Sequence, residues 1–282
     1  MSDNTKKTLI VEGGGFKTAF TTGVLDAFLE KGYNPFQSYY GVSGGAIAIS
    51  YYLSEQKEDC YKAHLHMTEA KGFTKFSRLF SKKGMMDIDY MKTIASKEFP
   101  FDIDTAKKNR ENKEVYFVVA NKLSGKPEYL SPEGKLWVEK VIASCTLPFV
   151  TKGTQYINDK PYFDGGWSDP IPVKRAYEQG AKHITLLRTY PRDFQHTRTW
   201  PNYLGSKLNR SKVLRNLYAN MHNRINEGLT FAKNPPADLK VDIIDPKEVL
   251  ASTIMGYSIE SINTDYQYGK NSGLEYLKNL NT

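Results

Sequence analysis

The feature that most constrains the fold of this chain is a short run at residues 41–45, which reads G-V-S-G-G. Aromatic and apolar residues enter this G-x-S-x-G motif, and a run of small and apolar residues leaves it. A strand that turns sharply into a helix at such a motif is a nucleophile elbow, which exposes the serine hydroxyl. Gly41 and Gly45 have no Cβ atom to collide across the turn, and the N–H of Gly44 is free at the helix start to donate to an oxyanion. Because the motif is short, the prediction that Ser43 is a nucleophile requires partners elsewhere in the chain.

A second glycine cluster begins 30 residues before this serine (43 − 13 = 30), where a strand-like segment meets Gly13, Gly14 and Gly15. Such a loop before a helix can point all its N–H groups at one anion, either a nucleotide phosphate or a reaction oxyanion. A plain tight turn is the structural alternative. A nucleotide loop needs G-x-G-x-x-G or P-loop spacing, but Thr18 holds the sixth position and the P-loop spacing is absent. Lys17 opposes the helix dipole in the first turn, which favours a role near developing negative charge.

A carboxylate follows a predicted hairpin at residues 155–163, whose turn lies near Asn158 and Asp159. The hairpin delivers Asp164, and the following Gly165 and Gly166 let the backbone approach the carboxylate closely. An ordinary Asx turn is the structural alternative, because an aspartate before a glycine is common in turns.

The remaining patterns predict one domain of 282 residues. Its core is expected at about residues 8–190, with a central strand at 113–121 and another buried strand at 182–188. Residues 56–100 are expected to be helical on apolar spacing that includes Leu79 and Phe80. A basic, helical, lid-like segment is expected at 190–236. A C-terminal strand and helix follow at 240–282, the helix from Tyr257 onward.

His64 and His66 lie two residues apart, on different faces of any helix, and are expected to be surface or rim residues rather than a metal pair. Cys60 and Cys145 fit a reduced compartment and indicate no metal cluster, and no cofactor is expected. The chain has no apolar stretch that could span a bilayer and no signal-peptide core after Met1. We therefore expect a cytoplasmic protein that could bind peripherally at the inner membrane surface.

Most of the formal net charge of +8 lies between residues 188 and 224, where Asp193 is the single acid among eight basic residues. The basic residues are Arg188, Arg192, Arg198, Lys207, Arg210, Lys212, Arg215 and Arg224. Aromatic and apolar residues interleave with them, and four of these fit one helical face: Leu214, Leu217, Tyr218 and Met221. Such a segment suits an anionic lipid surface or a lid over the active site. A helical pair that packs on the core is the structural alternative, and nucleic acid is not expected because no nucleic-acid motif accompanies the charge.

The order of the three signals, glycine loop, G-x-S-x-G and D-G-G, resembles that of the patatin-like phospholipase family over roughly residues 8–190. Residues 143–148, A-S-C-T-L-P, resemble the family's A-S-x-x-x-P segment. The resemblance implies a three-layer α/β fold with a mostly parallel sheet and hydrolysis of lipid acyl esters by a Ser-Asp dyad without histidine. It assigns Ser43 as nucleophile, Asp164 as base, and the three loop glycines as oxyanion hole. The chain departs from the family at Thr18, where the family's loop usually ends in glycine.

A dyad demands a buried aspartate, because free aspartate, with a pKa of about 3.9, is a weak base for a serine proton at neutral pH. The sequence therefore predicts a hydrogen bond between the side chains of Ser43 and Asp164. One alternative is an α/β-hydrolase triad completed by His183, His196 or His222. The other is a catalytically silent lipid-binding or scaffold protein, which intact Ser43 and Asp164 disfavour.

Overall fold

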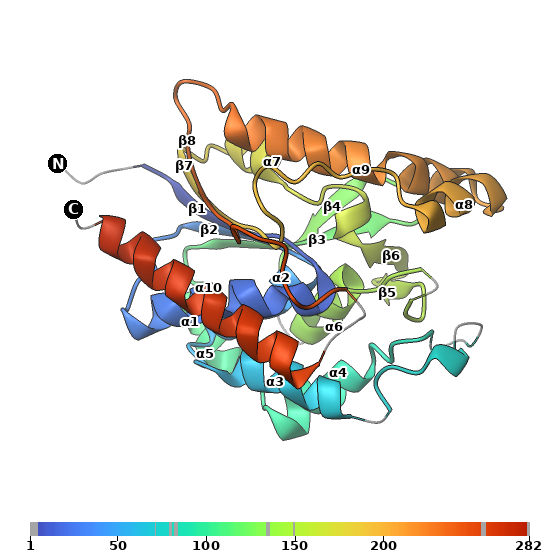
Figure 1. Cartoon of the computed structure of the whole chain (residues 1–282), viewed down its shortest axis with the longest axis horizontal. Coiled ribbons are helices and arrows are strands. Elements are labelled where there is room, and N and C mark those ends of the chain that lie inside the picture. Colours follow the sequence, from blue (N-terminus) through green and yellow to red (C-terminus); the bar gives the residue numbers. More distant parts are fainter. Residues whose placement is uncertain are drawn as a thin grey trace.

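The computed structural model describes residues 5–70, 72–78, 81, 84–133, 136–148, 150–254 and 258–280. Three layers are visible in Figure 1, a central sheet with helices on both faces. The expected α/β/α architecture is therefore confirmed. None of the described helices is both long and apolar enough to cross a bilayer.

The sheet has the strand order β5-β6-β3-β2-β1-β7-β8, and β4 also pairs with β3. Neighbours are parallel from β3 through β2, β1 and β7 to β8, whereas β4, β5 and β6 pair antiparallel, so the sheet is mostly parallel as expected. The strands are β1 (Lys7–Val11), β2 (Ser38–Val42), β3 (Glu114–Asn121), β4 (Pro127–Leu130), β5 (Gln155–Ile157), β6 (Lys160–Asp164), β7 (His183–Leu187) and β8 (Lys240–Ile244). The predicted 155–163 hairpin is β5–β6, and its turn residues Asn158 and Asp159 have positive φ angles of 48° and 63°.

Both faces of the sheet are buried, because alternate strand residues enter different core clusters. Leu9 and Val11 pack with α1, α2, α6 and α10, whereas Ile10 packs with α7 and α9. The helices are α1 (Thr18–Glu30), α2 (Gly44–Leu53), α3 (Asp59–Glu69), α4 (Tyr90–Thr93), α5 (Ile103–Asn109), α6 (Trp137–Ser144), α7 (Val173–Glu178), α8 (Trp200–Leu208), α9 (Lys212–Lys233) and α10 (Ile259–Leu280). A π-helical turn, Ile94–Glu98, extends α4. α10 lies beside α1 across the front of the molecule in Figure 1.

The prediction that residues 56–100 are helical is only partly right. α3 and α4 with its π turn are present, but between them Thr74 forms an antiparallel bridge with Met86. The apolar spacing there has another cause, because Phe73 and Met86 fill a core cluster beside α3 from an irregular segment. Leu79 and Phe80 lie outside the described residues, as does Tyr257 at the start of the predicted C-terminal helix.

The basic segment forms α8 and α9, and the structure corrects the interpretation of its apolar face. Leu217 and Tyr218 are buried against Phe163 and Trp167, so this face of α9 packs on the core. Arg188, counted among the surface charges, is completely buried. The exposed apolar residues of the segment lie instead mainly on α8, which has no buried residue.

Candidate active site

The sheet topology brings the ends of β2 and β6 together. β2 pairs with the first part of β3, with Val42 opposite Val118, and β6 pairs with the second part, with Asp164 opposite Val119. Because β4 pairs with residues 117–120 along the other edge of β3, β2 and β6 must share one edge. β6 runs antiparallel to β3, so its last residue, Asp164, meets Ser43, which directly follows β2.

Ser43 occupies the turn between β2 and α2 in a positive-φ conformation, with φ 53° and ψ −126°. This is unusual for a residue with a side chain and is the conformation expected of a nucleophile elbow. The flanking glycines are required by close packing. A Cβ atom on Gly41 would lie 2.6 Å from the Cα of Ala46, and one on Gly45 would collide with the carbonyl oxygen of Val11. The local geometry predicted from the motif is therefore present.

The Ser43 hydroxyl donates a hydrogen bond to Asp164 Oδ2 at 2.6 Å, so the predicted side-chain contact is confirmed. The other carboxylate oxygen, Oδ1, accepts the N–H of Gly166 at 2.7 Å, which fixes the orientation of the carboxylate. Gly165 packs directly on the Val118 carbonyl group. Asp164 is 2% exposed, and burial raises its pKa to about 6, although the hydrogen bonds from Ser43 and Gly166 act in the opposite direction. The carboxylate is thus a stronger base than a free aspartate.

Ser144, at the end of α6, holds the elbow in place. Its hydroxyl accepts the backbone N–H of Ser43 at 2.9 Å and donates to the carbonyl oxygen of Val118 at 2.7 Å. The hydroxyl therefore bridges the end of β2 to β3 where their direct ladder stops. The sequence contained a signal for this residue, because Ser144 is the serine of the A-S-x-x-x-P segment, but the spacing alone gave it no role.

The glycine loop lies against the nucleophile, since a Cβ atom on Gly13 would be 2.8 Å from the Cβ of Ser43. Thr189 Oγ1 donates to the Gly13 carbonyl oxygen at 2.7 Å. Because the C=O and N–H of a trans peptide point in opposite directions, this bond fixes the direction of the Gly14 N–H. Within the part of the chain that the structure describes, the backbone N–H groups of Gly13, Gly14, Gly15 and Gly44 donate no hydrogen bond. These groups are therefore available to an oxyanion.

A buried ion pair supports the loop from behind. Arg188 Nε lies 3.3 Å from Glu12 Oε2, and the same carboxylate oxygen accepts the Thr189 N–H at 2.9 Å. Glu12 immediately precedes the loop, and Thr189 bonds both to Glu12 and to Gly13, so the ion pair and the loop are connected through Thr189. Sequence reasoning missed this connection because its members are about 176 residues apart.

Lys17 is buried behind the same loop. Its ammonium group lies 4.1 Å from the centre of the Tyr190 ring, a cation–π contact. Burial lowers the pKa of Lys17, and the nearby carboxylates of Asp265 and Glu12 oppose that change. Lys17 is therefore not an ordinary exposed lysine.

Thr18, the departure from the family's glycine, forms contacts that glycine could not. Its hydroxyl donates to the Gly15 carbonyl oxygen at 2.6 Å and lies 3.1 Å from His64 Nε2. His64 Nδ1 lies 2.7 Å from the Cys60 carbonyl oxygen, and burial lowers the pKa of the imidazole, which favours its neutral form. The prediction that His64 is a surface or rim residue was wrong, because His64 is buried and tied to the loop through Thr18.

A largely apolar pocket opens at Ser43. Gly15, Thr18, Gly44 and His64 line it near the serine, and the rest of its wall is mostly aliphatic, methionine and phenylalanine side chains. The Cys145 thiol lies beside the Ser43 hydroxyl, and burial raises its pKa, so it remains a protonated thiol. A nucleophile next to free N–H donors and an apolar wall suits an apolar acyl group. In the described residues, no cluster of three potential metal ligands is found.

A family model described as patatin-like phospholipase matches residues 9–177, which is more than half of the chain. The chain belongs to the patatin-like phospholipase family. A second family model, a domain of unknown function (DUF6363), matches residues 212–282, which contain α9, β8 and α10.

Two individual proteins are similar to this patatin-like chain. The uncharacterized protein YjjU of Escherichia coli (strain K12) is 30% identical over 272 residues, covering 95% of this chain and 76% of YjjU. The crystal structure of VipD from Legionella pneumophila matches with a TM-score of 0.50 and 12% identity, covering 97% of this chain and 67% of that chain. The VipD likeness concerns the fold alone.

The five histidines all lie in the described part of this patatin-like chain, and none of them hydrogen-bonds to Ser43 or Asp164. His183 Nε2 lies 2.6 Å from Asp242 Oδ2, and His196 packs edge-on against the rings of Tyr190 and Phe194. The alternative triad therefore has no histidine in contact with its aspartate.

Proposed function

We propose that this protein is a serine acyl hydrolase that cleaves carboxylic ester bonds of phospholipids or other lipids. The observation that carries the proposal is the 2.6 Å hydrogen bond from Ser43 to the buried Asp164. Beside it lie an apolar pocket and glycine N–H groups that donate no hydrogen bond to any residue that the structure describes. Ser43 and Asp164 form the catalytic dyad in this proposal. Gly13, Gly14, Gly15 and Gly44 form the oxyanion hole. Membership of the patatin-like phospholipase family supports the same reaction class.

In the first half-reaction, Ser43 Oγ attacks the ester carbonyl carbon while Asp164 Oδ2 takes the hydroxyl proton. The carbonyl π electrons move to oxygen, and this oxyanion accepts hydrogen bonds from the glycine N–H groups. Each such donor is typically worth about 3 kcal/mol in the transition state. The tetrahedral intermediate then expels the alcohol, which leaves with the proton from Asp164, and an acyl ester remains on Ser43.

The second half-reaction is the reverse of the first, with water in place of the alcohol. Asp164 takes a proton from water as its oxygen attacks the acyl carbon, and the second oxyanion occupies the same hole. Collapse breaks the bond to Ser43 Oγ, which recovers its proton from Asp164, and the free fatty acid departs. Lys17 and the Glu12–Arg188 pair are proposed to support the loop and its electrostatics, and Ser144 to hold the elbow.

The pH dependence follows from the base. Asp164 must be deprotonated to accept the serine proton, and its pKa is about 6. We expect kcat/KM for a water-soluble ester to be level above about pH 7 and to fall tenfold per pH unit well below 6. Circular dichroism over the same pH range separates this loss from unfolding. Activity that stays level down to pH 4 would contradict the assignment of Asp164 as the base.

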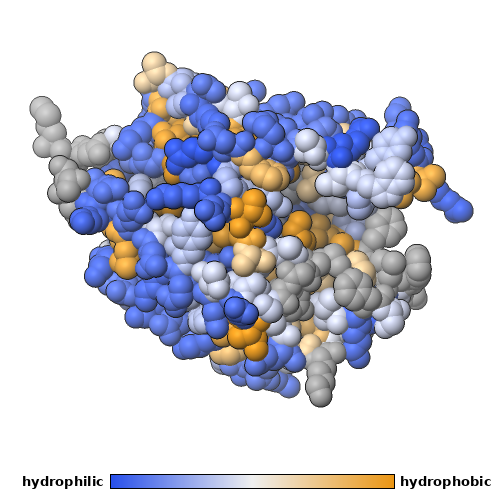
Figure 2. Space-filling model, viewed as in Figure 1, coloured by the Kyte–Doolittle hydropathy of each residue, from blue (hydrophilic) through white to orange (hydrophobic). Residues whose placement is uncertain are grey.

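Contact with an anionic membrane surface forms part of the proposal, and the exposed residues of α8 support it. Trp200 is 69% and Leu208 75% exposed, and Trp200 stacks on Tyr203 with ring centres 5.7 Å apart. Lys207, Arg210 and Lys212 are exposed on α8, in the following turn and at the start of α9. At the far right of Figure 2, where Figure 1 shows α8, an apolar spot lies among hydrophilic side chains. Exposed apolar side chains bordered by basic ones are suited to an anionic lipid interface.

Vesicle binding tests this surface. Replacing Lys207, Arg210 and Lys212 together with Gln is expected to weaken co-sedimentation with anionic vesicles at least tenfold, since each basic group near the surface contributes about 1 kcal/mol. The matched control removes the same charge elsewhere, at the exposed Lys57, Lys108 and Lys278. Equal binding by the two triple variants, or binding that is independent of lipid charge, would exclude α8 as the membrane contact.

A further inference from the structure

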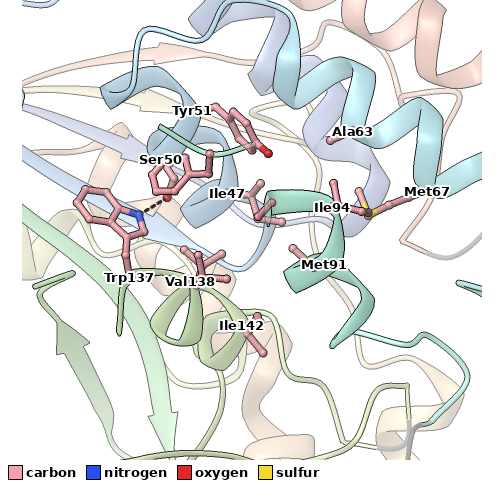
Figure 3. Close-up of a pocket in the computed structure, with 13 residues that line it drawn as sticks. Ile47, Ser50, Tyr51, Ala63, Met67, Met91, Ile94, Trp137, Val138 and Ile142 are labelled. Carbon is pink, nitrogen blue, oxygen red and sulfur yellow. Dashed lines mark hydrogen bonds between the residues drawn. The ribbon is translucent and has the colours of Figure 1, made fainter. Parts of the chain in front are cut away.

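A second apolar cavity lies behind the pocket of Ser43, on the side of the sheet that α1 covers. Figure 3 shows its lining, with Ile47 and Tyr51 from α2, Ala63 and Met67 from α3, and Trp137 from α6, together with Met91 and Ile94 from the α4 region. The catalytic proposal uses none of the side chains that line only this inner cavity.

The two cavities are neighbours that share part of their walls. Ile47, Met67 and Met91 line both the pocket of Ser43 and the inner cavity. Ile47 is four residues after Ser43, so it lies one helical turn further along α2. A chain bonded to Ser43 and running along α2 would have to pass these three side chains to reach the inner cavity.

The polar atoms in the wall of the inner cavity are already paired. Trp137 Nε1 donates to Ser50 Oγ at 2.9 Å, as the dashed line in Figure 3 shows, and Ser50 Oγ donates to the Ala46 carbonyl oxygen at 2.7 Å. The Tyr51 hydroxyl donates to the Phe99 carbonyl oxygen at 3.1 Å. An occupant therefore finds no free hydrogen-bond donor among these groups, which suits an alkyl chain and disfavours a ligand that needs donors.

The far end of the cavity is an aromatic wall. Ring centres lie 5.8 Å apart for Tyr51 and Phe101, and 5.6 Å apart for Phe101 and Trp137. α2 begins and α6 ends at the active site, so Tyr51 and Trp137 stand at the distant ends of the two helices. The wall sets a length for the occupant.

We propose that the inner cavity binds the distal part of the substrate's acyl chain, so that the enzyme prefers straight, medium-chain acyl esters. This inference rests on the proposed function. Tyr51 is eight residues beyond Ser43 (51 − 43 = 8), which corresponds to about 12 Å along a helix. An extended alkyl chain advances about 1.3 Å per carbon, given C–C bonds of about 1.5 Å, so roughly nine carbons span this distance.

Entry requires side-chain movement, because the free volume of the inner cavity is about 40 Å³. Met67 and Met91 stand at the entrance, and the unbranched, flexible methionine side chain can change rotamer to admit a chain. Short acyl groups need no such movement, because they fit within the pocket of Ser43.

The test compares esters of one alcohol with straight acyl chains of 2 to 16 carbons. Wild-type kcat/KM is expected to rise up to about 8–10 carbons and to fall for longer chains. Ala95→Phe, in the wall of the inner cavity, should lower kcat/KM for the ten-carbon ester on the order of 100-fold, because four excluded methylenes each contribute about fourfold. The four-carbon ester should change less than threefold. Ser96→Phe, at the exposed neighbouring position, is the matched control, and Val138→Ala should move the optimum to longer chains.

A binding measurement separates this inference from the proposed function. Decanoate binding is measured by calorimetry in the Ser43→Ala background, with and without Ala95→Phe. One outcome is that the protein hydrolyses esters but Ala95→Phe changes neither the chain-length profile nor the affinity for decanoate. This outcome would overturn the acyl-chain cavity and leave the proposed hydrolase function standing. Decanoate binding that Ala95→Phe abolishes, in a protein that hydrolyses none of the esters, would support the cavity and overturn the proposed function.

Discussion

Asp164→Asn is expected to lower kcat/KM for ester hydrolysis by roughly 10³-fold or more, about as much as Ser43→Ala, because removing either member of a nucleophile–base pair disables both. The asparagine keeps the size of the side chain and can still contact Ser43, but it cannot take the serine proton. Replacing His183, His196 or His222 singly with Asn should change kcat/KM less than threefold. Hydrolysis of a soluble ester by all five purified variants provides the measurement.

Thermal unfolding of the same variants is the control, since each must remain folded for its kinetics to be read. A histidine variant that is folded but as inactive as Ser43→Ala would support the triad mechanism and contradict the dyad mechanism. A wild-type protein that binds lipid vesicles but hydrolyses no member of a broad acyl-ester panel would instead support the silent lipid-binding alternative.

The parts of the site that the sequence predicted share one property, because each is encoded by a few consecutive residues. The strained turn at Ser43 needs glycine at positions 41 and 45, and this requirement can be predicted from the sequence without knowing the fold. The same holds for Asp164, whose orienting donor, Gly166, is two residues away. The fold followed from such local signals together with the family resemblance.

The parts that the sequence did not predict are polar side chains whose partners come from distant segments. In the sequence, Arg188 looks like another surface charge in a basic run. In the structure, it lies beside Glu12 because of how the sheet is assembled. His64 lay in a polar, weakly patterned helix, and its contact with Thr18 depends on how α3 packs against α1. Composition and periodicity describe a residue's own element, so they cannot reveal a partner that only the packing of two elements supplies.

The packing of α10 on α1 is a further feature that no local pattern revealed, and it leads to the largest expected effect on stability. A Cβ atom on Gly269 would collide with the carbonyl oxygen of Phe20, and one on Gly23 with the carbonyl oxygen of Tyr266. The two helices therefore approach so closely that each needs glycine where it crosses the other's backbone. α1 begins directly after the glycine loop, so this helix crossing also holds the loop in place.

Gly269→Ala is accordingly expected to lower the free energy of unfolding by about 3 kcal/mol, through overpacking against backbone that cannot rotate away. The sign of this change in stability distinguishes a close crossing from an unconstrained position, because alanine at an unconstrained helix position is about 1 kcal/mol more favourable than glycine. Asn271→Ala, at an exposed position two residues along α10, is the matched control and should leave stability within about 0.5 kcal/mol. Equilibrium urea unfolding of the three proteins measures both values. If Gly269→Ala proved as stable as the wild type or more stable, α10 could not approach α1 this closely, and the loop would need another anchor.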